Sequence, residues 1–373
     1  MKILVTGANG FIGKNLTAEL ENRGFGDILR YDVDTPKELL TEYTRKCDFI
    51  FHLAGVNRPK DTSEFMKGNF GFTEELLNAL KANENRAPII VSSSIQASLN
   101  NPYGESKKAG EELLFRYSQD TGARVYVYRL PNVFGKWCRP NYNSVVATFC
   151  HNIAHGLEIK INDPKTRLEL VYIDDVVNEF ISTMLTDTPN ERSGSGIYHS
   201  VPVTHSICLS ELADTIRSFR DQRTSLFVPD QGNELYKKLY STYLSYLPTD
   251  SFSYELNMHK DDRGSFTEFL KTAESGQVSV NVIKPGITKG NHWHHSKNEK
   301  FLVVKGEGLF RFRKHGAEEI IEYRVSGDPL KVVDIPTGYT HSIVNVGNDD
   351  MVVIIWANEV FDPKRPDTYF EEV

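Results

Sequence analysis

The stretch NHWHHSKNE combines histidine and glutamate side chains at a spacing that could bind a metal ion. His292 and His294 are two residues apart, so in a β-strand both project from the same face. Glu299 follows in the same stretch, and His341 lies in a separate predicted strand, YTHSIVN. Imidazoles and a carboxylate that converge suit a divalent transition metal with a position open to water or substrate. The alternative is a histidine cluster on the surface or held by hydrogen bonds, which we expect of His295 because strand alternation turns it away from His294.

A second group of reactive side chains lies in the sequences VSSSIQA and YGESK. Tyr103 and Lys107 are four residues apart, which places them on one face of a helix. A lysine ammonium beside a phenol favours the phenolate, so we expect a tyrosine pKa lowered toward neutrality and proton transfer to a carbonyl. Ser94 is the serine expected to hydrogen-bond that carbonyl, with Ser93 as the alternative. A surface tyrosine beside a solvated lysine would show the same spacing.

A glycine loop, TGANGFIG, stands between a predicted strand and a predicted helix. Gly7, Gly10 and Gly13 allow a tight turn and a close approach to a pyrophosphate, which the helix N-terminus also attracts. Asp32 stands at the end of the next predicted strand, where an acid that binds the ribose hydroxyls of NAD is expected. Arg30 could instead pair with the 2′-phosphate of NADPH. The residues alone leave the choice between the two cofactors open.

The elements that must position these groups change in type near residue 250. Before it, apolar runs such as KILVTG, DFIFHLAG and PIIVSSS alternate with amphipathic helical stretches. This pattern predicts a Rossmann-type, doubly wound parallel sheet over residues 1–250. After it, strands separated by Gly, Pro and Asp turns predict an all-β antiparallel barrel over residues 251–373.

Composition limits the partners. The chain has 373 residues and a net charge of −7, without a clustered basic patch, so we expect neither a nucleic-acid nor a membrane partner. Its four cysteines form no CxxC pair, which favours a reducing compartment. No apolar run approaches the ~18 residues of a membrane span. The first predicted strand begins within two residues of the N-terminus, leaving no room for a signal peptide. We therefore expect a cytoplasmic protein.

The N-terminal motifs resemble the extended short-chain dehydrogenase/reductase family, which includes nucleotide-sugar epimerases, dehydratases and reductases. The resemblance covers roughly residues 1–245 and makes Ser94, Tyr103 and Lys107 the catalytic set. It implies that Asn132, in RLPNVFG, contacts the nucleotide-sugar diphosphate. Arg167 is near the family's phosphate-binding arginine, although its spacing to Tyr172 is one residue longer than usual. The cofactor contacts implied are Gly7, Gly10, Phe11, Ile12, Gly13, Arg30, Asp32, Leu53, Ala54, Gly55, Tyr103 and Lys107.

The C-terminal motifs resemble the cupin fold, whose two motifs share glycines and metal ligands at fixed spacing. Leu330 stands where a glycine is usual. DDRGSFTEF resembles the opening of the sugar-nucleotide 3,5-epimerase branch, in which the arginine, here Arg263, contacts substrate phosphate. Those epimerases generally use a histidine base at the position of His292 and no metal. The full ligand set here favours His292 as a ligand. The matching residues are Gly286, His292, His294, Glu299, Gly306, Pro336, Gly338, His341 and Asn345.

The two chemistries can share one ketone. Removal of a proton beside a ketone gives an enolate that a metal can stabilise, and the same ketone is the substrate of a Ser-Tyr-Lys reductase. With both domains in this order, the chain resembles bifunctional enzymes of capsular polysaccharide synthesis. This resemblance implies C3 epimerisation of a UDP-linked 2-acetamido-4-keto-6-deoxy-L-sugar by the cupin and reduction at C4. The implied product is UDP-N-acetyl-6-deoxy-L-talosamine, on the route to UDP-N-acetyl-L-fucosamine. NADPH, Zn²⁺ and a homodimer are also implied.

Other functions remain open from the residues. The cupin could bind a ligand or form a dimer interface without catalysis, or the N-terminal motifs could belong to a 4-epimerase that retains its cofactor. The base of a cupin epimerase is also open. Tyr339, Lys289 and Lys300 are candidates, although each residue type is more often structural or solvated.

Overall fold

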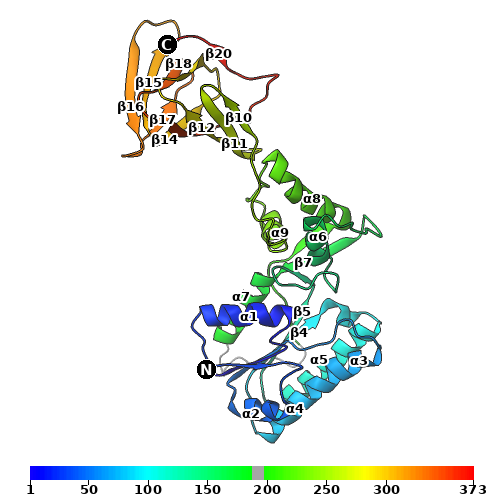
Figure 1. The fold of residues 1–373 in the computed structure, drawn as a ribbon. Coiled ribbons are helices and arrows are strands. Elements are labelled where there is room, and N and C mark those ends of the chain that lie inside the picture. The colour runs from blue at the N-terminus through cyan, green and yellow to red at the C-terminus, as the bar shows by residue number, and fades with distance from the viewer. Residues whose placement is uncertain (187–196) are drawn as a thin grey trace. The chain divides into compact units, whose positions relative to one another are not determined.

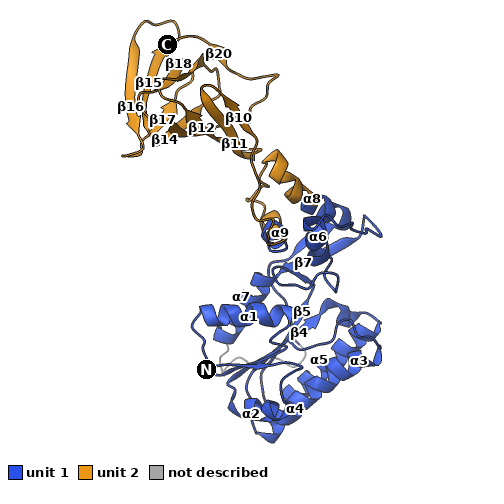
Figure 2. Ribbon diagram, in the orientation of Figure 1, with its two compact units in different colours: residues 1–216, 238–247 blue, residues 217–237, 248–373 orange. Residues whose placement is uncertain are grey.

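The computed structural model describes residues 1–186 and 197–373. The chain divides into two compact units, shown in different colours in Figure 2. Unit 1 comprises residues 1–216 and 238–247, and unit 2 comprises residues 217–237 and 248–373. The divisions at 216/217 and 237/238 fall inside two helices, α8 (Leu209–Ser225) and α9 (Glu234–Leu244).

Unit 1 is built on a parallel sheet of six strands (Figure 1). Its order is β2 (Ile28–Tyr31), β1 (Ile3–Thr6), β3 (Phe49–His52), β4 (Ile89–Ser94), β5 (Val125–Leu130) and β8 (Tyr198–His199). All residues of β1 and β3 are buried, as expected of strands covered on both faces. The chain order reverses direction across β1, and ligands of such sheets bind at the carboxyl ends of the strands near this point.

Helices cover both faces of this sheet. On one face, α1 (Phe11–Asn22) packs with α7 (Ile173–Thr186) over a core that includes Leu16 and Phe180. The other face carries α2 (Lys37–Lys46), α4 (Phe72–Ala82) and α5 (Pro102–Thr121). The remaining elements of the unit are α3 (Ser63–Phe65), the π-helix Met66–Gly71, the 3₁₀ helix Ile95–Ser98, α6 (Val145–Ala154) and a small sheet of β6 (Asn132–Phe134), β7 (Arg167–Tyr172) and β9 (His205–Cys208).

Unit 2 is formed mainly by two antiparallel sheets that enclose an apolar core with Phe301, Phe310 and Ile343. The first contains β10 (Met258–Asp261), β11 (Gly264–Thr272), β12 (Gly276–Ile283), β19 (Met351–Ala357), β14 (Glu299–Lys305) and β17 (Val332–Ile335). The second contains β16 (Ile320–Ser326), β15 (Glu307–Lys314), β18 (Tyr339–Asn345), β13 (Thr288–Trp293) and β20 (Tyr369–Phe370). A Rossmann-like parallel sheet followed by a β cupin-like domain confirms the predicted fold class.

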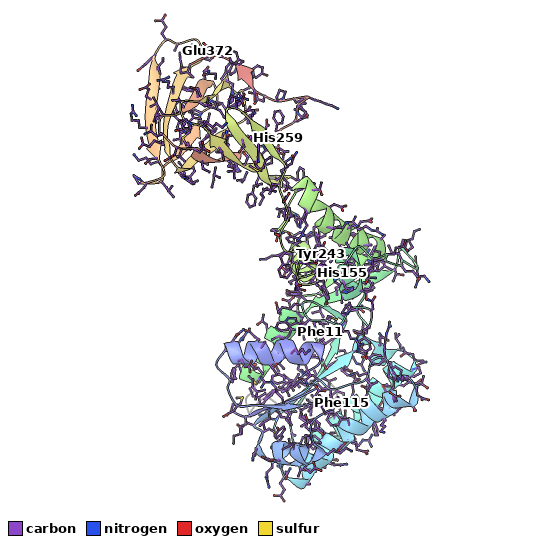
Figure 3. All side chains as sticks on the ribbon, viewed as in Figure 1. Phe11, Phe115, His155, Tyr243, His259 and Glu372 are labelled. Atoms are coloured by element: carbon purple, nitrogen blue, oxygen red, sulfur yellow. The ribbon has the colours of Figure 1, made fainter. Side chains whose placement is uncertain are left out.

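Figure 3 shows that side chains fill the spaces between the ribbons within each unit. Phe11, which is labelled there, is the first residue of α1. Among residues 1–186 and 197–373, no helix combines the length and apolar composition needed to cross a membrane.

Candidate functional site

A cleft of about 640 Å³ in unit 1 brings together most of the side chains that the N-terminal motifs single out. The glycine loop, the segment after β3 and the start of α5 all contribute residues to the cleft wall. The predicted residues that line it are Gly7, Gly10, Phe11, Ile12, Gly13, Leu53, Gly55, Ser94, Tyr103, Lys107 and Asn132. Arg30, Asp32, Ala54 and Arg167 do not line this cleft.

The glycine loop has no room for side chains. Gly7 has a φ of +68°, and a Cβ there would lie 2.7 Å from the backbone nitrogen of Ala54. A Cβ on Gly13 would lie 2.2 Å from the carbonyl oxygen of Gly7, so this glycine allows α1 to pack against the loop. Gly10 precedes α1 and provides no side-chain cap. The first N–H groups of α1 therefore face the cleft as a cradle that fits a pyrophosphate.

Asp32 and Arg30 lie beside the loop rather than in the cleft. The Asp32 carboxylate accepts hydrogen bonds from the backbone N–H groups of Asn9, at 2.7 Å, and Val33, at 2.8 Å. Arg30 forms an exposed ion pair with Glu21. The acid is thus tied to the loop that holds the cofactor in this fold, whereas the arginine has a protein partner of its own.

Ser94, and not Ser93, meets the phenol of Tyr103. Ser94 ends β4 and forms a side-chain hydrogen bond with Tyr103. The hydroxyl of Ser93 donates instead to the buried carboxylate of Glu111, which also forms an ion pair with Arg129 at 2.6 Å. Of the two serines considered, only Ser94 is directed at the tyrosine.

The expected lowering of the Tyr103 pKa is wrong for this arrangement. Burial raises the pKa of the phenol, and the hydrogen bond with Ser94 only partly opposes that effect. Lys107 Nζ donates to the carbonyl oxygen of Ser92 at 3.2 Å. Burial lowers the pKa of Lys107 to about 8, against the opposing charge of Glu111. Desolvation thus dominates both groups, because the short sequence spacing says nothing of how deeply they are buried.

The segment HLAG has two different roles. A Cβ on Gly55 would lie 3.0 Å from Lys107 Nζ, so this glycine leaves space for the ammonium group. His52 is buried, with Nδ1 2.8 Å from the Thr6 hydroxyl and Nε2 2.9 Å from the Thr73 hydroxyl. Burial lowers the pKa of His52 to about 3, so the imidazole is neutral and structural.

The two predicted phosphate contacts of unit 1 are in different places. Asn132 lines the cleft, and its amide donates to the carbonyl oxygen of Glu169 at 3.1 Å. Arg167 is exposed on β7, where its Nε donates to the Ser206 hydroxyl at 3.3 Å.

Sequence reasoning missed three basic residues of the cleft wall, Lys14, Arg58 and Arg139. Only Lys14 had a sequence signal, because it directly follows the last glycine of the loop.

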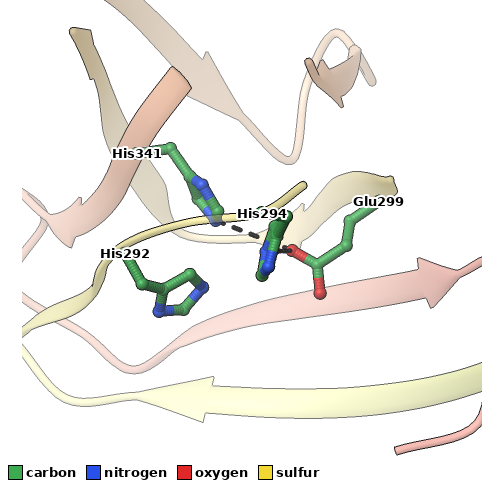
Figure 4. A group of neighbouring side chains, drawn as sticks. All are labelled: His292, His294, Glu299 and His341. Carbon is green, nitrogen blue, oxygen red and sulfur yellow. Dashed lines mark hydrogen bonds and ion pairs between the residues drawn. The ribbon is translucent and has the colours of Figure 1, made fainter. Parts of the chain in front are cut away.

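Unit 2 contains a cavity of about 840 Å³ between strands of both sheets. His292, Glu299 and His341 lie on its wall, together with Arg263 and Lys289. One ligand atom from each of His292, His294, Glu299 and His341 lies within 4.8 Å of the others, as Figure 4 illustrates. The structure therefore brings all four predicted metal ligands into one cluster.

A bulge in β13 directs this strand into the cavity. Gly290 pairs with Ser342 and His292 pairs with His341, so Asn291 is an extra residue, with a φ of +59°. Residues three apart on a regular strand face opposite sides. The extra residue allows both Lys289 and His292 to line the cavity.

The cluster has the protonation that metal binding requires. Burial lowers the pKa of His292 to about 4 and that of His341 to about 3, so both imidazoles are neutral near pH 7. Burial raises the pKa of Glu299, but its contacts with the imidazoles of His294 and His341 hold the pKa below its usual value. Within the described residues, neither ring nitrogen of the buried His341 has a hydrogen-bond partner. Neutral imidazoles, a carboxylate and the lone pair on one ring nitrogen of His341 fit a divalent transition metal.

Of the three candidate bases, Lys289 is the one that lines the cavity. Its Nζ lies 2.6 Å from Asn281 Oδ1, and burial lowers its pKa. Lys300 pairs with Asp334 on the surface at 2.5 Å, and Tyr339 is not part of the cavity wall. Arg263 lines the cavity and pairs with Asp261 at 2.6 Å.

Comparison with known families matches both parts of the chain. Residues 3–197 match the NAD dependent epimerase/dehydratase family. Residues 259–369 match the polysaccharide biosynthesis C-terminal domain.

Similar proteins extend over the whole chain. A UDP-2-acetamido-2,6-beta-L-arabino-hexul-4-ose reductase of Pseudomonas aeruginosa is 49% identical over 99% of this chain and 98% of its own length. The capsular polysaccharide assembling protein CapF from Staphylococcus aureus is 54% identical in sequence to this chain. Its crystal structure superposes on this structure with a TM-score of 0.92, over 100% of both chains. A UDP-glucose 4-epimerase of Thermotoga maritima shares the fold of unit 1, at 20% identity and a TM-score of 0.54 over 66% of this chain and 98% of the epimerase. The chain therefore belongs to the NAD-dependent epimerase/dehydratase family, and within it to the CapF-like nucleotide-sugar reductases and epimerases that carry a polysaccharide biosynthesis C-terminal domain.

Proposed function

We propose that this chain is a bifunctional enzyme that converts a UDP-linked 2-acetamido-4-keto-2,6-dideoxy-L-hexose. Residues 251–373 epimerise the sugar at C3, and residues 1–250 then reduce the C4 ketone with NADPH. The product is UDP-N-acetyl-6-deoxy-L-talosamine, a precursor on the route to UDP-N-acetyl-L-fucosamine for capsular polysaccharide. The observation that carries the proposal is that one chain holds Ser94, Tyr103 and Lys107 in a cleft with the glycine loop, and gathers three histidines and a glutamate at a second cavity.

The reduction assigns one task to each side chain of the cleft. Ser94 hydrogen-bonds the ketone oxygen, and Tyr103 gives that oxygen its proton as a hydride reaches C4. A nicotinamide cofactor held by the glycine loop would supply the hydride and would itself be oxidised. Lys107, beside Gly55, provides the positive charge that favours the phenolate left on Tyr103. The neutral phenol that burial favours is the form that can donate a proton.

The epimerisation requires loss of the C3 proton and its return to the other face. We assign removal of the C3 proton to Lys289, because this amine lines the cavity and burial favours its neutral form, which accepts the proton. Solvent supplies the proton that adds to the opposite face. We assign contact with the substrate phosphates to Arg263, which lines the same cavity. Zinc, held by His292, His294, Glu299 and His341, would supply the positive charge that stabilises the charge developing beside the ketone.

The test uses the purified full chain and the UDP-4-keto sugar in deuterated buffer without NADPH. The NMR signal of the C3 proton is followed before and after removal of the metal by a chelator. Loss of this signal only in the zinc-loaded protein, followed by formation of the C4 alcohol when NADPH is added, supports the proposal. Parallel reactions with NADPH and NADH decide the cofactor. A sedimentation measurement tests whether the chain forms the homodimer that the family resemblance implies.

A second candidate is a reductase whose C-terminal unit binds ligands or forms a dimer interface without catalysis. This second candidate is favoured by the similar protein of Pseudomonas aeruginosa, because the name of that protein specifies a reductase and no epimerase. Turnover of NADPH without any C3 exchange, with and without zinc, would establish this second function and exclude the first.

A further inference from the structure

The C-terminal segment of unit 2 holds the loop that follows the metal-binding strand. Asp367 Oδ1 accepts the backbone N–H of His295 at 2.9 Å. Asp367 Oδ2 accepts the backbone N–H groups of Ser296, at 2.9 Å, and Lys297, at 2.8 Å, and also the Ser296 hydroxyl at 3.1 Å. One carboxylate therefore fixes the conformation of three consecutive residues between His294 and Glu299.

The backbone of Asp367 acts directly on one metal ligand. Its carbonyl oxygen lies 2.6 Å from His294 Nδ1. A carbonyl oxygen can only accept, so Nδ1 must carry the hydrogen of the neutral imidazole. The lone pair is then on Nε2, which lies 3.3 Å from Glu299 Oε2 within the cluster. This contact selects the tautomer and the ring orientation that a metal ligand needs.

Contacts on either side of Asp367 tie the same two segments together. Lys297 is only 7% exposed, and its Nζ donates to the Pro366 carbonyl at 2.9 Å and to the Thr368 hydroxyl at 2.7 Å. β20 then pairs with β13, where Phe370 lies opposite His292. The segment thus contacts both the strand and the loop that carry the ligands.

Asp367 occupies an unusual backbone conformation, with a φ of +37°. Residues other than glycine rarely adopt this region, and such strain persists only where the surrounding contacts impose it. Here the hydrogen bonds to residues 295–297 and to His294 impose it.

We propose that Asp367 is a positioning residue for the metal site, and that residues 366–370 form a clamp that holds His294 in its liganding tautomer and orientation. The inference rests on the zinc site of the proposed function. Without the carboxylate, residues 295–297 lose their common acceptor and the carbonyl oxygen of residue 367 no longer stays within reach of His294. The expected result is weaker metal binding without loss of any ligand atom.

The test compares Asp367→Ala and Asp367→Asn with the wild-type chain. Zinc affinity is measured by competition with a chromophoric chelator, and the ligand geometry is followed by the visible absorption of the Co²⁺-loaded protein. Asp362→Ala is the matched control, because Asp362 lies in the same C-terminal region and caps only the backbone N–H of Lys364, at 2.9 Å, in the hydrogen bonds described. We expect Asp367→Ala to bind zinc about 10–100-fold more weakly and to show an altered Co²⁺ spectrum. Asp367→Asn, which keeps one acceptor oxygen, should lie in between, and Asp362→Ala should match wild type.

The outcomes separate the two ideas. Wild-type protein that binds no zinc would overturn both the metal site and the clamp. Wild-type binding with an unchanged affinity and spectrum in Asp367→Ala would overturn the clamp alone. If the alanine variant does not fold, the same comparison is made with Asp367→Asn, and an unaltered affinity and spectrum in that variant count against the clamp. Reduction of the C3-epimerised keto sugar with NADPH should be unchanged in every variant.

Discussion

His52 in unit 1 and His341 in unit 2 are equally buried, at 2% exposure each, yet their surroundings differ. Burial lowers the pKa of both imidazoles to about 3. His52 has a threonine hydroxyl at each ring nitrogen, whereas His341 has no hydrogen-bond partner among the described residues. His341 Nε2 instead lies 3.6 Å from Glu299 Oε2, an atom of another potential ligand. Burial and pKa alone do not distinguish a structural histidine from a ligand, but the partners of its nitrogens do.

The same contrast applies to the two sites as wholes. In the cleft, Tyr103 and Lys107 are neighbours on one helix, and their surroundings are hydrogen-bonded protein groups. In the cavity, the ligands come from β13, β14, β18 and the residue after β13, and they point at one another. In our proposal the first site transfers a proton and the second holds a cation. We therefore expect single substitutions to separate the two activities.

The largest expected effect separates the two sites at Tyr103. Tyr103→Phe removes the proton donor, so NADPH oxidation with the keto sugar should fall by about 10²–10⁴-fold. C3 exchange should stay at the wild-type rate. Tyr117→Phe is the control, because Tyr117 is on the same helix but donates its hydroxyl to the Asn85 carbonyl, at 3.1 Å, away from the cleft. Equal loss of both activities in Tyr103→Phe would show that the sites do not act separately.

The next effect concerns the cavity. Lys289→Met should reduce C3 exchange by about 10²-fold, because it removes the amine that we assign to proton transfer. Zinc content, and NADPH oxidation with the C3-epimerised keto sugar as substrate, should be unchanged. Lys300→Met, which alters an exposed lysine paired with Asp334, should leave exchange unchanged. The rates are measured by NMR in deuterated buffer. Full exchange in zinc-loaded Lys289→Met would transfer the role of base to another group.

The sequence predicted the sites whose geometry depends on local spacing. The glycine loop, the helical Tyr103 and Lys107 pair and the two motifs of metal ligands each came together as expected. The spacing could not predict burial, so the direction of the Tyr103 pKa was missed. It also could not predict Asp367, because the chain must fold back over β13 before this residue, 73 positions from His294, reaches the imidazole. Arg167 illustrates the same limit, since its position on β7 directs it away from the cleft.

A comparison of stability tests the two histidines directly. His52→Leu leaves the hydroxyls of Thr6 and Thr73 without their imidazole, so unit 1 should lose about 1–3 kcal/mol of unfolding free energy. His341→Leu removes two buried nitrogens that lack partners in the described chain, so metal-free unit 2 should be as stable as wild type or more stable. Hydrogen exchange of peptides from each unit under mild denaturant measures both changes. A loss of stability in metal-free His341→Leu equal to that in His52→Leu would remove the distinction between them.

The smallest effect is a pH dependence that His52 gives to unit 1. Its pKa is about 3 in the folded state, below the ~6.5 of an unfolded histidine, so the unfolded chain takes up the proton first as the pH falls. The stabilisation is complete above pH ~6.5 and is lost toward pH ~3, by at most about 1.4 kcal/mol per pH unit for this one group. Carboxylates also make the free energy of unfolding depend on pH. They are the same in wild type and in His52→Leu, so their contribution cancels in the difference between the two proteins. The difference in unfolding free energy between wild type and His52→Leu, measured by hydrogen exchange in unit 1 at pH 7.5 and pH 5, should therefore shrink at the lower pH. A constant difference would mean that His52 is protonated to the same extent in the folded and unfolded chain. The hydrogen bonds of its ring with Thr6 and Thr73, and not the loss of its charge on burial, would then determine what His52 contributes to stability.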